Sequence, residues 1–558
     1  MKLSKRDVVS FGLLALLIVV SVSPRTRGPI DLRWDAGVYY VLGTSLVEGK
    51  GYRLLNEPGQ IEAVQYPPLL PASIAAVETL TGSRKPADVG RWLRVEYLLL
   101  FAIYVFMAYA VARRYVSPAP AFAVAFFCVA NAYTHFLGDE ATADLPYGVA
   151  TAGFVFFASA RPGRMQEMTT AAFCVAAYLF RTAGLALMLA WIGDALVQRR
   201  FRAAVIRLII CLLPIGAWSA YVTQVEHSPA YARPAYSYQR ADYLFYNVSY
   251  ARNMALKDML RPEAGKVSAR DFFIERLVPN LVRFPSVLGQ TLTSQRWSWD
   301  ASGTAALGRL GVSPRLATVI CRAIPILTGV IVICGGFMFL IRGYTLVFLV
   351  MLFSSVLICA TPWLDQMVRY AMPLNPLSAL LLVAMLLTIK RFLDGLVPGG
   401  LTWVPAVGLW LVLTLLAGQT AFTLLRFYRD LHSQAVPLEP RDGNATYKLF
   451  FYDPSYRALD EALDWIQRRA TKGEILASSM PQWTYIHTGL SSVMSPLERN
   501  PALVQRDLDS VPVSFLIVQR GGPINMEPYV TAVLRFPALW SKVYSDKGEY
   551  IRVYSRIR

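Results

Sequence analysis

The chain has 558 residues, of which 55% are hydrophobic and 16% are charged. Soluble domains carry roughly a quarter of their residues as charged side chains, so this composition excludes an ordinary soluble fold and predicts an α-helical polytopic membrane protein. The formal net charge of +18 does not indicate nucleic acid here, because cationic loops fix membrane topology and contact anionic headgroups.

Apolar stretches of the length needed to cross a bilayer, roughly 20 residues, recur along most of the chain. The first lies at 8–23, after the basic start MKLSKR, and is followed directly by Pro24. A proline there is a poor context for signal-peptide cleavage, so we interpret the stretch as a retained anchor. With this anchor, ten further stretches predict about eleven transmembrane helices, centred near residues 103, 126, 152, 174, 190, 213, 330, 352, 380 and 412.

The distribution of lysine and arginine predicts the orientation. The short loop HFLGDEATAD, residues 135–144, contains neither residue type, whereas the loops on either side of it are basic. The positive-inside rule then predicts a cytoplasmic N-terminus. Residues 1–427 would form a transmembrane domain with extracytoplasmic segments at about 24–91 and 225–312. A bacterial inner (plasma) membrane is the expected location.

Residues 428–558 predict a small extracytoplasmic α/β domain. The stretch YRALDEALDWIQRRA, residues 456–470, repeats apolar residues at helical spacing. The short runs EILASS, VSFLIVQR and YIRVYSR are rich in strand-forming residues, and the first two are nearly continuous in apolar character, as in a covered sheet.

The first extracytoplasmic segment begins with a charged and aromatic motif, WDAGVYY, and continues to YPPLLP. Asp35 follows the first apolar stretch, and Tyr39 and Tyr66 are candidates to bind substrate. Two interpretations of Asp35 stay open. It could cap the helix that follows it, or it could act as a general base on a substrate hydroxyl.

The second extracytoplasmic loop carries four ionisable residues: His135, Asp139, Glu140 and Asp144. Asp144 could cap the next helix and favour its positive end. Alternatively, it could meet Asp35 at one membrane surface, since both loops are predicted on the same side. In that case Asp144 is a catalytic candidate, and the other three residues are candidates to bind substrate.

Two arginines lie at predicted membrane edges. Arg181 follows AAYLF, and Arg369 is followed by Tyr370 at the start of a late span. Ionisable residues within or beside membrane spans are candidates for function, and guanidinium groups bind phosphate through two hydrogen bonds. The alternative is that both side chains reach to lipid headgroups. Arg181 and Arg369 are therefore candidates to bind phosphate, and Tyr370 is a candidate to contact substrate.

Several well-known motifs are absent from the sequence. It contains no P-loop, no H-E-x-x-H, no G-x-S-x-G and no dinucleotide fingerprint. All six cysteines lie in apolar stretches, which does not indicate a zinc site. The sequence therefore predicts no dedicated metal site and no nucleotide, so a transfer reaction would need a substrate that is already activated.

Five short motifs occur in an order that resembles a known family: WDAGVYY, YPPLLP, TADLPYG, FRTAGL and RYAMPLNPL. Over residues 1 to about 425 the chain resembles GT-C-fold glycosyltransferases of the protein O-mannosyltransferase and aminoarabinose-transferase group. The resemblance implies a polyprenyl-phosphate-linked sugar donor and a glycan, lipid or protein acceptor. It implies that Asp35 acts as base, that Asp144 is the second acid, and that Arg181 and Arg369 hold donor phosphate. It also leaves room for a divalent cation.

The sequence departs from this family at two places. Ala36 follows Asp35, where relatives often have Glu. Gln65 and Tyr66 stand where aminoarabinose transferases have an acidic-basic pair, which argues against lipid A modification. Two alternatives stay open: an oligosaccharide ligase that uses a polyprenyl-diphosphate donor, for which the Tyr- and Arg-rich segment 225–312 is suited, and a non-catalytic lipid-glycan transporter or assembly protein.

Overall fold

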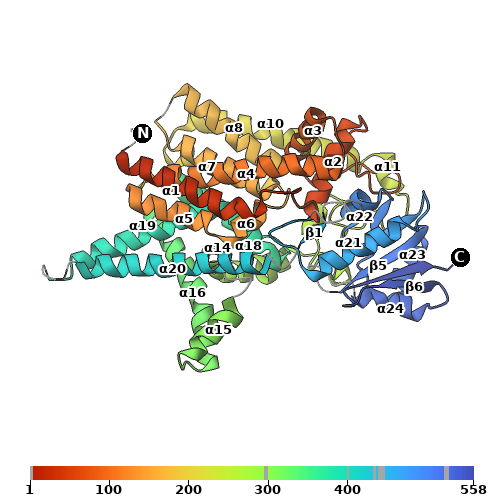
Figure 1. The fold of residues 1–558 in the computed structure, drawn as a ribbon. Coiled ribbons are helices and arrows are strands. Elements are labelled where there is room, and N and C mark those ends of the chain that lie inside the picture. The colour runs from red at the N-terminus through yellow and green to blue at the C-terminus, as the bar shows by residue number, and fades with distance from the viewer. Residues whose placement is uncertain are drawn as a thin grey trace.

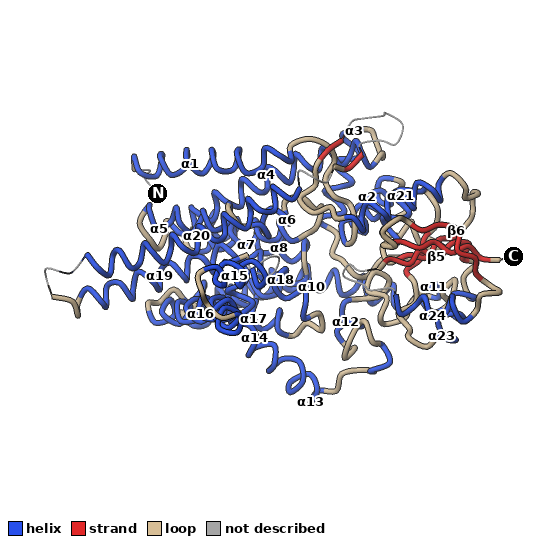
Figure 2. The backbone as a smooth tube through the Cα atoms, turned by 60° about the horizontal axis from the view of Figure 1, so that its bottom comes forward, coloured by secondary structure: helices blue, strands red, loops and turns tan. Residues whose placement is uncertain are grey.

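The computed structural model describes residues 4–161, 163–294, 299–398, 401, 403–431, 435–437, 446–520 and 527–557. A bundle of helices fills one side of the molecule, and a smaller unit with a β-sheet lies at one end of it (Figure 1). Figure 2 shows the strands of the larger sheet gathered at that end, away from the N-terminus and from most of the long helices. The short antiparallel pair β1 (Val436–Pro437) and β2 (Thr446–Tyr447) forms a separate two-stranded sheet.

Six helical stretches in the described part are long and apolar enough to cross a membrane. They are Lys5–Arg25, which contains α1 (Lys5–Val22), α4 (Pro86–Ala112), α10 (Phe201–Glu226), α16 (Pro314–Ile341), Leu364–Asp394, which contains α18 (Met367–Ala371) and α19 (Asn375–Asp394), and α20 (Trp403–Leu431). The shorter helices between them are α5 (Pro118–Val129), α7 (Asp144–Ala158), α8 (Arg164–Phe180), α9 (Leu185–Val197) and α17 (Thr345–Cys359).

Every stretch that the sequence marked as apolar is thus helical, and the prediction of a helical polytopic membrane protein is confirmed. The number of helices that cross the bilayer stays a prediction, because five of the eleven are shorter than a straight span requires. The shared core of the bundle includes Tyr97, Phe101, Phe154, Trp191 and Leu381, each nearly inaccessible to solvent.

Part of the predicted segment 225–312 packs into the bundle. Its helix α14 (Val278–Thr293) lies along α16, and a Cβ added at Gly289 or Gly329 would overlap the backbone of the facing helix at Pro325 or Pro285. Glycine at these two positions therefore lets the helix backbones touch. The rest of the segment holds the short helices α11 (Pro229–Ala232), α12 (Tyr250–Met254), α13 (Ala269–Asp271) and α15 (Trp299–Arg309).

The C-terminal unit is built on a five-stranded sheet of order β4-β3-β5-β7-β6, in which β4, β3 and β5 are parallel and β7 and β6 are antiparallel to their neighbours. The strands are β3 (Ile475–Ser478), β4 (Ser492–Met494), β5 (Val513–Gln519), β6 (Trp540–Ser545) and β7 (Ile551–Arg556). Every residue of the central strand β5 is buried, which explains its continuous apolar sequence. Helices α21 (Pro454–Gln467), α22 (Pro481–Thr488), α23 (Pro501–Asp509) and α24 (Glu527–Arg535) accompany the sheet.

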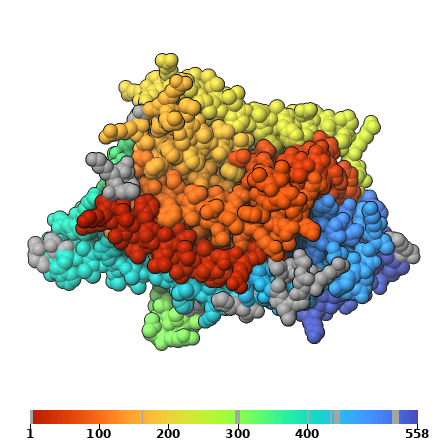
Figure 3. Space-filling view, turned by 45° about the horizontal axis from the view of Figure 1, so that its top comes forward, coloured from red at the N-terminus to blue at the C-terminus, as the bar shows by residue number. Residues whose placement is uncertain are grey.

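The C-terminal unit packs on both earlier segments that the sequence predicted to be extracytoplasmic. The first segment contains α2 (Asp35–Val47) and α3 (Leu69–Thr81), and its Asn56 exchanges hydrogen bonds with Ser492 of β4 at 2.8 and 3.0 Å. The second segment contributes Tyr238, whose hydroxyl donates to the carbonyl of Met494. Figure 3 shows the N-terminal third of the chain, in red and orange, meeting the blue C-terminal unit at the surface. The three segments therefore meet at one end of the helical bundle.

Candidate active site

A cavity of about 820 Å³ lies where the helical bundle, the first two predicted outer loops and the C-terminal unit meet. Its wall includes Asp35 at the start of α2, Asp144 at the start of α7, Arg181 at the end of α8 and Arg369 on α18. We call these four residues the cavity cluster. They come from four separate parts of the chain, so the fold is what brings them together.

Arg369 bridges the two carboxylates. Its Nε donates to Asp144 Oδ2 at 3.0 Å, and its Nη2 donates to Asp35 Oδ2 at 2.8 Å. Arg181 forms an ion pair with the other oxygen of Asp144. The cluster thus contains two formal negative and two formal positive charges in direct contact, which limits the cost of placing each charge beside the bundle core.

Hydroxyl groups complete the surroundings of Asp35. Tyr66 and Tyr246 each donate to Asp35 Oδ1, both at 3.2 Å. The hydrogen bonds of Asp35 therefore go to side chains across the cavity, and none joins it to the first backbone amides of α2. The helix-cap interpretation is not supported for Asp35. Its place at the first residue of α2 still stabilises the carboxylate, because the amino end of a helix carries partial positive charge.

The predicted aromatic residues also line the cavity. The rings of Tyr39 and Tyr66 pack with centroids 4.8 Å apart, and the guanidinium of Arg181 lies 4.9 Å from the ring centroid of Tyr370. All three tyrosines belong to the cavity wall. Their predicted contact with substrate remains a prediction that this placement allows.

Glu140 is another acid in the cavity wall, and it lacks the arginine partners that Asp35 and Asp144 have. Its side chain is buried, and its Oε2 accepts no hydrogen bond. Burial raises the pKa of Glu140 to about 8, although the nearby charge of Arg369 opposes this shift. Glu140 is therefore mostly protonated at neutral pH, and it can donate or accept a proton in the cavity.

His135 and Asp139 lie outside the cavity wall, so the structure does not bring them together with the other predicted site residues. Asp139 pairs with Arg25 at 3.1 Å and also with Arg94, and Arg25 Nη2 lies 2.6 Å from His135 Nδ1. We call these four residues the closed cluster. Asp139 also accepts the backbone N–H of Phe450, so the closed cluster joins the second loop to the chain that leads into the C-terminal unit.

Sequence reasoning missed most of the aromatic wall. The cavity is also lined by Trp34, Tyr133, Phe136, Phe245, Tyr246, Tyr250, Trp363, Phe427, Phe451 and Tyr456. Three of these lie in the segment YLFYNVSY of the second outer region, whose tyrosine content was a signal for sugar contact. The contribution of Tyr456 from the C-terminal unit had no comparable signal, because only the fold places α21 beside the cavity.

Among the described residues, no group of three or more His, Cys, Asp or Glu side chains could hold a metal ion. The carboxylates of the cavity cluster are instead paired with guanidinium groups. A divalent cation therefore stays a prediction without a matching set of ligands in that part of the chain.

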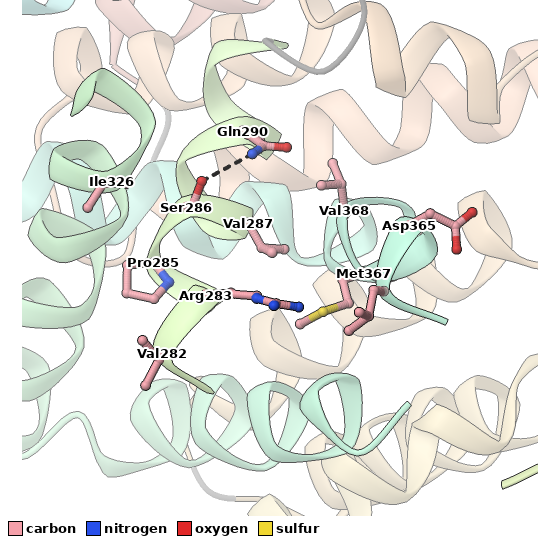
Figure 4. A pocket seen from close by; sticks show the side chains of 11 residues that line it. Val282, Arg283, Pro285, Ser286, Val287, Gln290, Ile326, Asp365, Met367 and Val368 are labelled. Atoms are coloured by element: carbon pink, nitrogen blue, oxygen red, sulfur yellow. Dashed lines mark hydrogen bonds between the residues drawn. The ribbon is translucent and has the colours of Figure 1, made fainter. Parts of the chain in front are cut away.

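A second cavity, of about 450 Å³, lies between α14, α16 and the segment before α18 (Figure 4). Its wall is mainly apolar, with Val282, Pro285, Ile326 and Val368, and Ser286 accepts a hydrogen bond from Gln290. Asp365 belongs to the walls of both cavities, so the two spaces adjoin at this residue.

No protein-family model matches the chain, and no curated protein sequence matches it significantly. Two groups of solved structures are similar in fold. One is ArnT from Cupriavidus metallidurans bound to undecaprenyl phosphate, with a TM-score of 0.50 at 14% identity over 99% of this chain and 98% of that one. Its apo state matches with the same TM-score and coverage.

The other is the archaeal oligosaccharyltransferase AglB from Archaeoglobus fulgidus in complex with an inhibitory peptide and a dolichol-phosphate. It has a TM-score of 0.54 at 10% identity over 99% of this chain and 74% of that one. These likenesses confirm the predicted GT-C fold, that of polytopic membrane proteins with a C-terminal unit. The chain is an integral membrane protein of this fold.

Proposed function

We propose that the protein is a membrane glycosyltransferase that moves a sugar from a polyprenyl-phosphate donor to a hydroxyl group of a glycan, lipid or protein. The observation that carries this proposal is the cavity cluster, in which two arginines and two carboxylates face a space large enough for a sugar. The two similar structures support it, since ArnT is bound to undecaprenyl phosphate and AglB to a dolichol-phosphate.

The arginines would bind the donor phosphate. In the structure Arg369 and Arg181 are partly exposed to the cavity, with side-chain exposures of 16% and 22%. An incoming phosphodiester competes with Asp35 for Arg369 and binds Arg181 beside Asp144, because each guanidinium has several donors in a fixed plane. When the bond between the sugar and the phosphate breaks, the phosphate gains a second negative charge, and the same donors stabilise it.

Asp35 would act as the general base. Binding of the phosphate draws Arg369 away from Asp35, which raises the ability of that carboxylate to accept a proton. The acceptor hydroxyl then attacks C1 of the sugar and loses its proton to Asp35, while the C1–O bond to the phosphate breaks. Attack opposite to the leaving phosphate inverts the anomeric centre. Asp144 would stay paired with Arg181 and hold it toward the phosphate.

An oligosaccharide ligase with a polyprenyl-diphosphate donor is the second candidate. The aromatic wall of a cavity of about 820 Å³ favours contact with more than one sugar ring, and the fold is also similar to that of an oligosaccharyltransferase. The difference between the two candidates is the number of phosphates and sugars that the cavity accepts.

The location follows from the same proposal. A cytoplasmic N-terminus and an extracytoplasmic C-terminal unit, in a bacterial inner membrane, agree with the meeting of all three predicted outer segments at one end of the bundle. A single introduced cysteine in the C-terminal unit, for example Arg499→Cys, should react with a membrane-impermeant maleimide in intact spheroplasts. If it reacts only after the membrane is opened, the orientation is reversed.

The proposal is tested with a panel of polyprenyl-phosphate and polyprenyl-diphosphate sugars offered to the purified protein, with and without acceptors. Release of free polyprenyl phosphate identifies the glycosyltransferase, and consumption of diphosphate donors alone identifies the ligase. Asp35→Asn should abolish release, whereas Asp88→Asn is a matched control, since Asp88 lies on α4 outside the cavity wall. If the folded wild-type protein consumes no donor, the catalytic proposal fails and a transporter or assembly protein is the better interpretation.

A further inference from the structure

The C-terminal unit holds the short segment that carries Asp35. Two side chains that precede Asp35 reach α21 of that unit. Trp34 donates from its indole Nε1 to the hydroxyl of Tyr456 at 2.6 Å, and Arg33 forms an ion pair with Asp460. The base proposed above is therefore attached, through its two neighbours, to a helix that lies more than 400 positions later in the chain.

Arg33 is enclosed in an aromatic box. Its side chain is only 2% exposed, and its guanidinium carbon lies 4.4 Å from the Trp483 ring centroid and 5.1 Å from that of Tyr452. The same aromatic residues hold Asp460, which accepts from Trp483 Nε1 at 2.9 Å and from the Tyr452 hydroxyl at 3.0 Å. A cation and its counter-ion that share the same neighbours form a rigid joint, because each fixes the orientation of the other.

The first turn of α2 also touches α22 directly. A Cβ added at Gly37 would lie 2.9 Å from the carbonyl oxygen of Leu32 and 3.1 Å from Cβ of Gln482. Only glycine allows α22 to approach this closely without displacement of one of the two chains. The C-terminal unit thus contacts the residues on both sides of Asp35.

The backbone at Trp34 is strained, which indicates that the contacts with the C-terminal unit hold this residue in place. Trp34 has φ of 50° and ψ of −130°, a combination that is costly for any residue with a side chain. Such a conformation persists only where the surrounding contacts enforce it. Here the indole hydrogen bond to Tyr456 and the Arg33–Asp460 pair lie at the strained residue and beside it.

We propose that the C-terminal unit is a positioning element of the active site. Tyr456 and Asp460 hold Trp34 and Arg33, and thereby fix Asp35 where Arg369, Tyr66 and Tyr246 reach it. Tyr456 and Asp460 are positioning residues in this view, since they act on the reaction through Asp35. The kinetic part of this inference rests on the proposed function, whereas its structural part does not.

The kinetic test compares three variants that each remove one polar contact of the C-terminal unit. Tyr456→Phe removes the partner of Trp34, and Asp460→Asn removes the charge opposite Arg33. Tyr238→Phe is the control, because the Tyr238 hydroxyl also joins the C-terminal unit to an outer segment but contacts Met494 and not residues 31–37. Tyr456 lines the cavity, whereas Asp460 and Tyr238 do not.

The two test variants should lower kcat roughly tenfold with the KM for donor changed less than twofold, since misplacement of the base slows the chemical step more than donor binding. Tyr238→Phe should leave both constants within twofold of wild type. A KM effect in Tyr456→Phe that Asp460→Asn does not share would assign Tyr456 a direct contact with substrate, and it would overturn the positioning role of Tyr456.

Hydrogen–deuterium exchange provides a measurement that needs no turnover. Residues 31–40 should exchange faster in Tyr456→Phe and in Asp460→Asn than in wild type, while Tyr238→Phe should leave this peptide unchanged. Trp34→Phe should produce the same increase as Tyr456→Phe, and the double variant should add nothing to either, because both substitutions remove one and the same hydrogen bond.

The two failures are distinguishable. If the wild-type protein consumes no donor but the exchange pattern is as expected, the proposed function fails and the structural part of the inference stands. If donor is consumed but the test variants match Tyr238→Phe in both kcat and exchange, the positioning inference is overturned while the proposed function stands.

Discussion

Two arginine–carboxylate clusters each take an acid from the segment between α6 (Ala132–Leu137) and α7, Asp139 in the closed cluster and Asp144 in the cavity cluster. They differ in what surrounds them. In the closed cluster, Arg94 and Asp139 are 2% and 3% exposed, and Arg94 also donates to the carbonyls of Gly28 and Pro29. In the cavity cluster, Arg369 and Asp35 are 16% and 23% exposed. The same pair of residue types thus stabilises the fold in the closed cluster and faces an open space in the cavity cluster.

This difference shows that an arginine–carboxylate pair alone does not identify an active site. In the closed cluster, the arginine N–H groups donate to backbone carbonyls and to a ring nitrogen. A ligand could bind these N–H groups only if several hydrogen bonds within the protein were broken. The cavity cluster exchanges its bonds only among side chains that face the cavity. The arginine N–H groups of the cavity cluster can therefore bind a phosphate without breaking any hydrogen bond to a backbone carbonyl.

The largest expected difference between the two clusters comes from neutralising one acid of the cavity cluster. Asp35→Asn should lower turnover roughly 10²- to 10⁴-fold, the range that a general base contributes, while the melting temperature stays near that of wild type. Donor turnover and thermal unfolding are measured on the same preparation. Turnover within a few-fold of wild type would mean that Asp35 does not accept the proton.

The matched change in the closed cluster should act on stability instead. Asp139→Asn leaves Arg25 and Arg94 buried without their charge partner, which should lower the free energy of unfolding by about 3 to 5 kcal/mol. Thermal unfolding in detergent measures the effect, and turnover per folded molecule should be unchanged. A variant that unfolds normally but has lost turnover would place Asp139 in the reaction, against its position outside the cavity.

Arg369→Lys tests the bridge itself. Lysine keeps the charge but not the planar fork of donors that reaches both carboxylates, so kcat/KM for donor should fall roughly 10²-fold. The corresponding change Arg94→Lys should alter the melting temperature and leave the KM for donor unchanged. Equal effects of the two substitutions on KM would remove the distinction between the clusters.

The raised pKa of Glu140 should make the free energy of unfolding depend on pH. Its pKa is raised from 4.5 to about 8 in the folded state, so the unfolded chain releases a proton between these values that the folded chain keeps. The free energy of unfolding should then fall as pH rises from about 4.5 to 8, by at most about 1.4 kcal/mol per pH unit. Glutamine does not ionise, so Glu140→Gln removes this fall in the free energy of unfolding. The melting temperature of the variant should exceed that of wild type at pH 8.5 and match it near pH 4.5. A difference independent of pH would show that Glu140 ionises normally.

The sequence predicted the helical stretches because apolar composition directly reports burial or lipid contact. It also predicted that Asp35, Asp144, Arg181 and Arg369 belong together, because short motifs and the alternation of basic loops place them at one membrane surface. The structure brings all four into contact. Their chemical roles stay predictions that the experiments above address.

The sequence could not separate Glu140 from Asp139. Asp139 lies in the turn that follows α6 (Ala132–Leu137), whereas the next residue, Glu140, forms an isolated β-bridge to Asp31. Asp139 pairs with Arg25 and Arg94 in the closed cluster, and Glu140 lines the cavity. Which of two adjacent acids faces the cavity depends on this change of backbone conformation, and no pattern in the short segment specifies it.

The contacts of the C-terminal unit with residues 31–37 could also not be predicted from the sequence. The pattern of residues 456–470 predicted a helix, and α21 confirms it. The side on which α21 meets residues 31–37 depends on contacts between parts of the chain that are far apart in sequence. Tyr456 and Asp460 have no local signature that separates them from other polar residues on a surface helix.

The central claim is that the two arginines of the cavity cluster bind a lipid phosphate, which takes the place of Asp35 on Arg369. The most direct measurement is a cryo-EM structure of the protein in nanodiscs with saturating undecaprenyl phosphate. The account predicts density for the phosphate between Arg181 and Arg369, with Asp35 no longer paired with Arg369. Phosphate density elsewhere on the protein, with the Arg369 bridge between Asp35 and Asp144 intact, would contradict it.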